Sequence, residues 1–445
     1  MEHSATSALK HFLNHCKLIL KHATHRTYSM MKLETQTLTT NGERLWQSLE
    51  EMAKIGAGLN GGCNRQALTD LDKQGRDLFI TWCKKIGCTI TIDSMGNIFA
   101  RRAGTNNDLP PVITGSHLDT QPTGGKYDGV YGVLAGLEVL ATLHEHEIKT
   151  QHPIEVVVWT NEEGARFSPA MIGSGVWAGV FDETYGHSRA DSEGNTIGQE
   201  LDRIGYKGSQ PAKAKPIKAA FELHIEQGPI LEIEKKQIGV VSGVQGMRWY
   251  DLILEGQPCH AGPTPMTVRI DPMMAIGPIT QRLYQLAEKF APWARVTFGD
   301  ISAQPAARNT VPERITLAVD LRHPQQDVLQ EMDKAFRTIV NQEAHKYKLA
   351  SCIRDEWDSP AVQFNQGCIN AVKDAVEDLG YSNMELFSGA GHDSVYVSQV
   401  APTSMIFIPC ENGISHNEAE NVLPEDVTAG GNVLLHAILN SAIKI

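Results

Sequence analysis

The sequence predicts an α/β protein in which helices cover both faces of a mixed sheet and a smaller α+β domain is inserted. The chain of 445 residues is longer than one hydrophobic core usually supports. Apolar, β-branched runs such as residues 154–159 alternate with helical patterns, which is typical of a sheet covered on both faces. Residues 245–356 carry the order β-α-β-β-α-β of a ferredoxin-like unit. We therefore expect an N-terminal extension over 1–30, a main domain over 31–244 and 357–445, and an inserted domain between the two parts.

Helices and strands of the first part of the main domain follow from apolar periodicity. The helix expected over 130–143 has Gly132, Ala135 and Gly136 on one side, which suits close packing. In chain order, we expect helices over 42–55, 69–86 and 130–143, a strand pattern over 88–98 with a turn at 93–96, and strands over 112–114 and 154–159.

The inserted domain begins with a strand, because residues 249–255 alternate strictly between apolar and polar side chains. Its other elements are helices over 272–290 and 327–347 and strands over 294–301 and 314–321. The α/β pattern then resumes with a helix over 364–379, a strand over 404–408 and a helix over 424–442.

Composition argues against several classes of protein. The net charge of -12, with no basic stripe beyond the first residues, disfavours nucleic-acid binding. No run of 18 apolar residues occurs, so we expect no membrane span. The eight cysteines include no CxxC pair, which indicates a reduced, cytoplasmic setting.

Residues 1–30 differ from the rest of the chain, because they are basic, contain five histidines and carry only Glu2 as an acid. Such a start is compatible with a transit peptide, which would place the protein in an organelle. A frayed extension or an upstream start codon is the preferred interpretation, since Met30 and Met31 follow. The histidines fit either a metal-binding tract or a solvated helix face.

Two polar motifs follow the strand expected over 112–114. His117 and Asp119 lie just beyond its end, where open α/β sheets place their ligands. Asp128 comes next, beside Gly129 and at the start of a predicted helix. Capping that helix is an alternative role for Asp128.

Further acids and histidines follow other predicted strands. Glu162 and Glu163 come directly after the strand over 154–159, and adjacent carboxylates in such a place are costly without a cation or a shared proton. His224 lies in a strand-like run, and His416 lies on a loop after the strand over 404–408. The candidate ligands, all at loops or strand ends, are His117, Asp128, Glu163, His224 and His416.

This mixture of nitrogen and oxygen ligands suits zinc or manganese. A carboxylate beside a metal ligand, as Glu162 is, suits proton removal from a water bound to the metal. Cys259 stands beside His260 and suggests a Cys/His nucleophile, but sequence neighbours seldom form such a pair.

Six motifs in order make the chain resemble the hydantoinase/carbamoylase amidase family. They are GSHLDT, GGKYDGVYGVLAGLE, TNEEGARFSPAMIGSG, HIEQGPILE, HAGPTPM and GISHNE, and the resemblance extends from about Asn41 to the C-terminus. The family belongs to a larger clan of aminoacylase-like and carboxypeptidase-like co-catalytic zinc hydrolases. Peptidases of the clan usually carry two acids where this chain has Asp128 and Gly129, so the sequence favours an amidase.

The resemblance implies two divalent metal ions per subunit, bridged by Asp128. Zinc is the first expectation, with manganese, cobalt or nickel as alternatives. One ion would also be held by His117 and His224, and the other by Glu163 and His416.

The same resemblance assigns roles around the metals. Glu162 would be the general base, and Asp119 would orient a ligand histidine. His260 would polarise the scissile carbonyl. Asn309 and Arg322 would bind the substrate carboxylate, for which the forked guanidinium group is suited. The pocket would be completed by Gln227, Gly391 and His392.

For three of these residues the sequence alone leaves other roles open. Arg322 fits a surface cation, Asn309 a turn residue, and His260 a strand-end histidine. The resemblance also implies a homodimer in which the inserted domain is both lid and dimerisation domain. His260 and Asn309 would then reach the site of the partner subunit.

The implied reaction is hydrolysis of the carbamoyl (ureido) C–N bond of a small ureido carboxylate. Substrates would be N-carbamoyl-β-alanine or N-carbamoyl-L-amino acids, giving the amino acid, ammonia and carbon dioxide. Allantoate amidohydrolase is the alternative, because it shares nearly every named residue. A non-catalytic binding homologue is a more distant alternative, since such proteins usually lose a ligand or the base and none is missing here.

Overall fold

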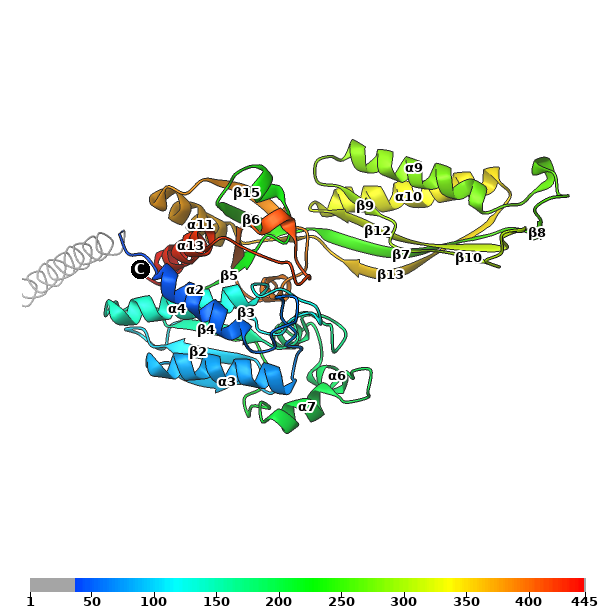
Figure 1. Ribbon diagram of the computed structural model, residues 1–445. Helices are drawn as coiled ribbons and strands as arrows, with labels where there is room; N and C mark the ends of the chain where they lie inside the picture. Colours follow the sequence, from blue (N-terminus) through cyan, green and yellow to red (C-terminus); the bar gives the residue numbers. More distant parts are fainter. Residues whose placement is uncertain (1–36, 444–445) are drawn as a thin grey trace, which may run out of the picture. The chain divides into compact units, whose positions relative to one another are not determined.

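The computed structural model describes residues 37–443 and divides the chain into two compact units (Figure 1). Unit 1 holds the described residues up to Val240, Asn365–Met384 and the residues from His392 onward. Unit 2 holds Val241–Phe364 and Glu385–Gly391. The predicted extension over residues 1–30 lies outside the described residues.

Unit 1 is built on a mixed sheet in which strands follow the order β1-β2-β4-β3-β5-β16. β4, β3, β5 and β16 pair in parallel, whereas β1 and β2 add antiparallel neighbours. The carboxyl ends of the four parallel strands therefore meet at one edge of the sheet. The strands are β1 (Thr89–Ile92), β2 (Ile98–Arg102), β3 (Val112–His117), β4 (Ile154–Trp159), β5 (Ala219–Ile225) and β16 (Thr403–Ile408).

Helices lie on both faces of this sheet. Thr114 and Val156 face Gly136 of α4, whereas the adjoining residues Ile113 and Val157 pack in a cluster with Trp177 of α5. Successive residues of a strand point to opposite faces, so α4 and α5 cover opposite sides. The predicted α/β class is confirmed. The side of α4 that carries small residues packs against the sheet.

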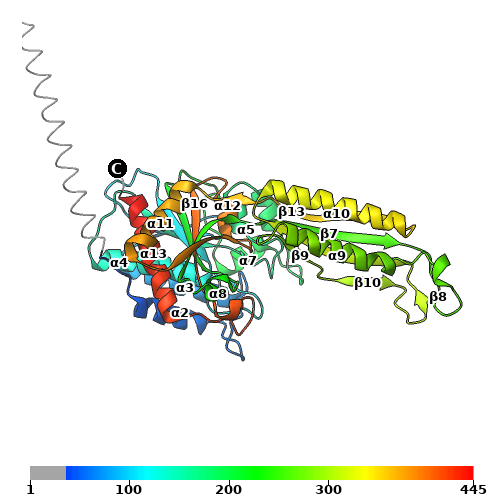
Figure 2. The ribbon, with the colours of Figure 1, turned by 90° about the horizontal axis from the view of Figure 1, so that it is seen from above.

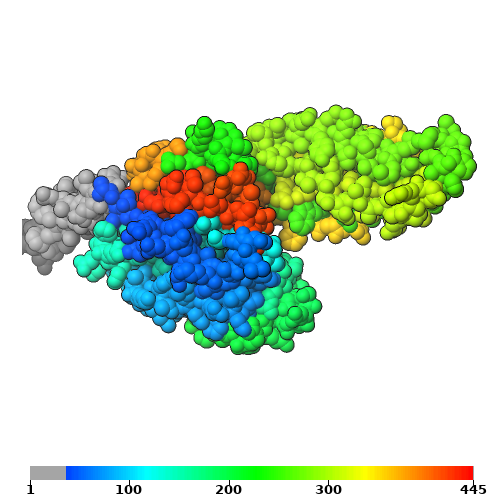
Figure 3. Space-filling model, viewed as in Figure 1, coloured from blue at the N-terminus to red at the C-terminus, as the bar shows by residue number. Residues whose placement is uncertain are grey.

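The helices of unit 1 include segments far apart in the sequence. They are α2 (Gly42–Ala53), α3 (Asp70–Lys85), α4 (Val130–Glu145), α5 (Ile172–Trp177), α6 (Glu183–Ser188), α7 (Ile197–Ile204), α8 (Ile230–Ile233), α11 (Gln366–Leu379), α12 (Asp393–Val397) and α13 (Pro424–Ala442), with a 3-10 turn at Glu411–Gly413. α2 packs against α13, and Figure 3 shows the first described segments (blue) beside the last (red). The Thr40 hydroxyl donates to Asn432 Oδ1 over 2.8 Å, which joins the two ends.

Unit 2 is a split βαβ fold with its sheet in the order β10-β12-β7-β13, and β9 also pairs with β12. Helices α9 (Met273–Lys289) and α10 (Gln326–Lys346) lie side by side (Figure 2) and share one apolar core with the sheet. The strands are β7 (Gly246–Glu255), β9 (Arg295–Thr297), β10 (Ile301–Gln304), β12 (Arg314–His323) and β13 (Ala350–Ser359), with a small ribbon of β8 (Cys259–His260) and β11 (Thr310–Val311) and a 3-10 turn at Met266–Val268.

The single strand predicted over 294–301 is wrong. The segment holds all of β9 and the first residue of β10, and the two strands are separated by Phe298, Gly299 and Asp300. Glycine weakens a strand interior because it has no side chain to pack. The ferredoxin-like order survives, because both pieces pair with β12.

Other predicted elements are close to the observed ones. The seven predicted helices are confirmed, with ends within two residues of α2, α3, α4, α9, α10, α11 and α13. Strands β6 (Ile238–Val244), β14 (Val362–Gln363) and β15 (Asn383–Ser388) contain or adjoin residues where the chain passes between units, and none was predicted. Across residues 37–443, no helix is both long and apolar enough to span a membrane.

Candidate metal centre and active site

The candidate ligands converge because the strands that carry them are parallel. His117 is the last residue of β3, His224 lies near the end of β5, and Glu163 follows the end of β4. His416 follows β16, and Asp128 lies between β3 and α4. The sheet therefore brings to one edge residues that are up to about 300 positions apart in the sequence.

Asp128 lies at the centre of this group. Its Oδ1 is 3.1 Å from His224 Nε2 and 3.7 Å from His117 Nε2. Its Oδ2 is 3.3 Å from His416 Nε2, and that same nitrogen is 3.4 Å from Glu163 Oε2. Each of the two sets, His117–Asp128–His224 and Asp128–Glu163–His416, offers ligand atoms that all lie within 4.8 Å of one another.

Gly129 makes the close approach of these residues sterically feasible. Its φ is +67°, and a Cβ at this position would lie 2.2 Å from His117 Nε2. Any side chain here would therefore strain the backbone and displace a ligand.

Asp119 holds the neighbours of the centre in two ways. Its backbone carbonyl lies 2.8 Å from His117 Nδ1 and so accepts a hydrogen bond from it, leaving Nε2 free to act as a ligand. Its carboxylate accepts the backbone N–H groups of Glu162 and Glu163 at 3.3 and 3.2 Å. Asp119 thus orients His117 through its main chain and fixes the adjacent acids through its side chain.

Glu162 is placed to act on a proton beside the ligands. It is buried, and its Oε2 lies 3.5 Å from His117 Nε2. Burial, followed by the charges of Asp393 and Glu163, raises the pKa of Glu162 well above its usual range. A carboxylate whose proton affinity is raised in this way is suited to take up a proton near neutral pH.

Burial and neighbouring charges also shift the pKa values of the candidate ligands. Burial and the charge of Asp128 raise the pKa of Glu163 to about 8. Burial opposes protonation of His224, yet the hydrogen bond and charge of Asp128 raise its pKa to about 9. Burial lowers the pKa of His117 to about 4. Buried acids and imidazoles crowded together form a donor set that suits a divalent cation of the zinc or manganese type.

Two of the predicted pocket residues lie against this centre. Gln227 donates from Nε2 to Asp128 Oδ2 over 2.8 Å, with its backbone at a φ of +56°. His392 is buried at the start of α12, with its ring 4.6 Å from that of His224. His392 also forms a third compact group with His224 and Glu222.

The other predicted substrate residues belong to unit 2. His260 on β8 and Asn309 beside β11 are exposed neighbours, because the Ala261 N–H donates to the Asn309 carbonyl over 2.9 Å. His260 Nδ1 accepts the N–H of Gly262 over 3.1 Å. The adjacent Cys259 is a free thiol.

Arg322 lies on β12 and is held by its own unit. Its Nη2 and Nε donate to Asp320, and Nη1 donates to the Gly389 carbonyl over 2.8 Å. Gly391 belongs to the same short segment, Glu385–Gly391. A guanidinium fixed on two sides presents a defined edge to an anion.

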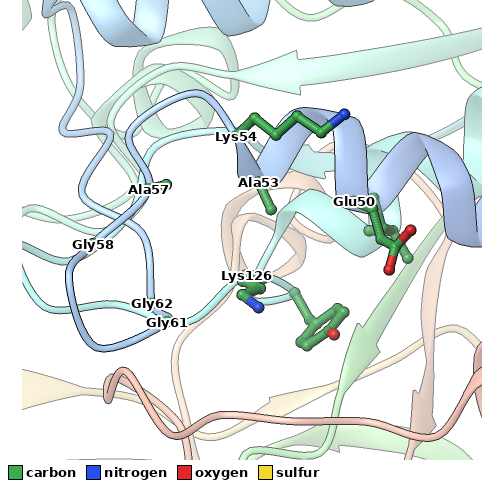
Figure 4. Close-up of a pocket in the computed structure, with 10 residues that line it drawn as sticks. Glu50, Ala53, Lys54, Ala57, Gly58, Gly61, Gly62 and Lys126 are labelled. Atoms are coloured by element: carbon green, nitrogen blue, oxygen red, sulfur yellow. The ribbon is translucent and has the colours of Figure 1, made fainter.

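A separate pocket of about 430 Å³ flanks the segment that carries Asp128 (Figure 4). It is lined by α2, by the glycine-rich loop that contains Gly58 and Gly62, and by Lys126 and Tyr127. The Tyr127 ring stacks on Trp46 at 5.9 Å. None of the candidate metal ligands lines this pocket.

A family model described as peptidase family M20/M25/M40 matches residues 113–440, which is most of the chain. The chain belongs to this family. Within the M20 family it is a hydantoinase/carbamoylase amidase, as the sequence motifs predicted. The family is metal-dependent, and the two ligand groups are the candidate places for metal in this chain.

Several relatives match almost the whole M20 chain. An N-carbamoyl-L-amino-acid amidohydrolase of Rhizobium meliloti is 47% identical over 402 residues, which are 90% of this chain and 97% of the relative. An allantoate amidohydrolase of Bacillus subtilis is 32% identical and covers 90% of this chain and 98% of its own. The solved structure of a hydantoinase/carbamoylase family amidase from Burkholderia multivorans has a TM-score of 0.90 at 53% identity, covering 92% of this chain and 99% of the other. The predicted enzyme class, a hydrolase acting on C–N bonds, is confirmed.

Sequence reasoning missed some residues of this M20 site. Glu222 is buried and accepts from Ser116 Oγ at 2.7 Å and from Ser394 Oγ at 2.6 Å, so it supports the strand end beside His224. Glu420 is buried behind Asp128. The signal for Glu222 was its place two residues before His224, whereas Glu420 had none, because it resembles a surface acid on a loop.

Proposed function

We propose that this chain hydrolyses the carbamoyl C–N bond of N-carbamoyl amino acids with two divalent metal ions per subunit. The observation that carries the proposal is the sharing of Asp128 by two ligand groups, one with His117 and His224 and one with Glu163 and His416. A carboxylate with one oxygen toward each group suits a bridge between two ions. Zinc is the first candidate for such a mixed set, and manganese, cobalt and nickel are alternatives.

The bound metals would polarise the ureido carbonyl and activate water. Glu162 is the general base, which takes a proton from the attacking water and returns it to the leaving nitrogen. His260 donates a hydrogen bond to the carbonyl oxygen as negative charge develops on it. Water then replaces the amine at the carbamoyl carbon, which releases the amino acid and carbamate. The carbamate breaks down to ammonia and carbon dioxide.

Arg322 and Asn309 bind the substrate carboxylate, and Gln227, Gly391 and His392 line the pocket. Support for Arg322 comes from the contacts with Asp320 and Gly389 that fix its guanidinium group. A guanidinium group that is already held in place loses less side-chain entropy on binding a carboxylate than a mobile guanidinium group does.

The active site is completed by a second copy of the chain. Within unit 2, the β8–β11 ribbon that carries His260 adjoins the Arg314 end of β12 (Figure 1), and Arg322 lies eight residues further along the strand. Eight residues of a strand span about 26 Å. A small ureido carboxylate cannot touch both ends, so His260 and Asn309 serve the partner subunit and Arg322 serves its own.

An exposed edge of unit 2 supports this homodimer. Within residues 37–443, β10 pairs with β12 on one side only, which leaves its other backbone edge for a partner. Ile301 on β10 and Tyr284 and Met273 on α9 are large apolar side chains about half exposed. Exposed apolar side chains beside an unpaired strand edge are typical of an interface between chains.

N-carbamoyl-L-amino acids are the preferred substrate class, because the relative that acts on them by name is 47% identical. Allantoate is the second candidate, supported by the allantoate amidohydrolase that is 32% identical. The free state of the seven described cysteines fits a reduced, cytoplasmic location.

A substrate panel with each divalent metal tests the function. It compares N-carbamoyl-L-amino acids, N-carbamoyl-β-alanine and allantoate at matched concentrations of zinc, manganese, cobalt and nickel. We expect the highest kcat/KM for an N-carbamoyl amino acid. A higher kcat/KM for allantoate would identify allantoate as the substrate instead. No turnover with any metal would favour a binding protein.

A further inference from the structure

The backbone that presents Asp128 is held by a buried carboxylate outside the ligand groups. Glu420 is 4% exposed, and its Oε1 accepts the N–H of Tyr127 over 2.9 Å and the N–H of Asp128 over 3.1 Å. One oxygen therefore fixes two successive peptide groups at the centre of the site.

The second oxygen of Glu420 reaches the Asp128 side chain through a serine. Glu420 Oε2 is 3.1 Å from Ser415 Oγ, and Ser415 Oγ is 3.0 Å from Asp128 Oδ2. A serine hydroxyl has one proton, so it donates to one of these carboxylates at a time. Gln227 Nε2 lies 3.3 Å from the same hydroxyl, so it can donate to Ser415 as well as to Asp128.

The chain leaves space for this carboxylate at a single glycine. A Cβ on Gly125 would lie 2.0 Å from the Glu420 carboxylate. No other residue type fits at position 125 without moving Glu420. The Glu420 carboxylate therefore packs directly against the backbone of Gly125.

Local contacts of this turn hold its carbonyl groups. The Val130 N–H donates to the Asp128 carbonyl over 2.7 Å, and the Tyr131 N–H donates to the Tyr127 carbonyl over 2.9 Å. The N–H groups of Tyr127 and Asp128 depend instead on an acceptor from elsewhere in the chain. Glu420 supplies that acceptor from a loop 292 positions away.

We propose that Glu420 is a positioning residue that fixes Asp128 for both metal groups at once. The inference rests on the proposed dinuclear centre, because Asp128 is the member that the two groups share. Displacing Asp128 would weaken both groups, whereas displacing Glu163 or His117 would weaken one.

The test measures zinc affinity by chelator competition on the full chain, together with the melting temperature of the metal-free protein. Glu420→Ala removes the acceptor, and Glu420→Gln keeps an amide oxygen that can accept both N–H groups. Glu418→Ala is the matched control, because Glu418 stands on the same loop and its carboxylate accepts from Asn60 over 2.8 Å. We expect Glu420→Ala to weaken zinc binding by about 10- to 100-fold, the usual cost of losing a residue that supports a ligand. Glu420→Gln should stay within about threefold, and the control should not change.

Two results would overturn the inference while the proposed function stands. One is zinc affinity of Glu420→Ala within twofold of the wild type, and the other is a loss in Glu420→Gln as large as in Glu420→Ala. If Glu420→Ala does not fold, Glu420→Asp replaces it, because the shorter acid withdraws the acceptor and should also weaken binding. A wild-type chain that binds none of zinc, manganese, cobalt and nickel would overturn the proposed function as well, so the two failures are distinguishable.

Discussion

The candidate functional residues of unit 1 and unit 2 differ in how much of their surroundings each unit supplies. In unit 1, His117 and His224 are 1% exposed and Asp128 is 5% exposed, and all three touch one another or a shared neighbour. In unit 2, His260 and Asn309 are exposed. The contrast teaches that His117, His224 and Asp128, as candidate metal ligands, are enclosed by their own unit, whereas His260 and Asn309, as candidate substrate residues, are exposed in theirs. The predictions below test that division.

Loss of the base in unit 1 should have the largest effect. Glu162→Gln keeps the shape of the side chain but cannot take a proton, so kcat should fall by about 10²- to 10⁴-fold. Metal content should be unchanged, because Glu162 is outside both ligand groups. Turnover and metal analysis on the same sample check this, with the exposed Glu193→Gln as control. Near-normal turnover in Glu162→Gln would remove it from the mechanism.

In unit 2, Arg322→Ala should weaken substrates that carry a carboxylate. A charge-assisted hydrogen bond contributes about 1.5–3 kcal/mol, so kcat/KM should fall by about 10- to 150-fold. A neutral ureido compound should be affected far less. Arg314→Ala is the matched control, because Arg314 lies at the opposite end of β12 and pairs with Glu255. Equal losses on charged and neutral substrates would contradict carboxylate binding.

Mixing defective subunits tests whether unit 2 serves a partner. A heterodimer of Glu162→Gln and His260→Ala chains has one intact site and one doubly defective site if His260 acts across the dimer. Purified heterodimers should then recover about half of wild-type activity by the symmetry of the dimer. Activity no higher than that of either parent would place His260 in its own subunit's site.

The smallest expected effect is a pH dependence of stability in the metal-free protein. Burial raises the pKa of Asp119 to about 7 and that of Glu163 to about 8. The native state then holds protons that the unfolded state has lost, so stability is greatest at low pH and falls as pH rises toward 8. The fall is about 1.4 kcal/mol per pH unit for each group at most.

Thermal melts from pH 5 to 8 measure this dependence. Glu163→Gln should reduce the slope, because an amide does not ionise. Added zinc should raise the melting temperature most at pH 8, where the ligands bind it as anions. A melting temperature that rises with pH in the metal-free wild type would contradict the account.

The sequence was sufficient for much of the fold, because long helices such as α10 and α13 have clear apolar periodicity. β6 was missed because its run IGVVSGV is buried throughout and contains two glycines, so it shows neither alternation nor a clear length. β9 and β10 were predicted as one strand because only three residues, Phe298, Gly299 and Asp300, separate them.

The site was less fully predictable. His117 and Glu163 stand at strand ends within long motifs, so they could be found without coordinates. Glu420 could not, because its function depends on backbone N–H groups of Tyr127 and Asp128 that no residue pattern reports. Asp119 was predicted to orient His117, but the sequence could not tell that its carbonyl contacts His117 and that its carboxylate contacts the backbone of Glu162.

The central claim is that Asp128 joins two metal groups, and counting metals per subunit tests it most directly. The measurement is elemental mass spectrometry on the wild type, Asp128→Ala and Glu163→Ala after loading with zinc and removal of the excess. We predict about two ions in the wild type, about one in Glu163→Ala and essentially none in Asp128→Ala, since Asp128 alone belongs to both groups. One ion retained in Asp128→Ala, or a single ion in the wild type, would contradict the account.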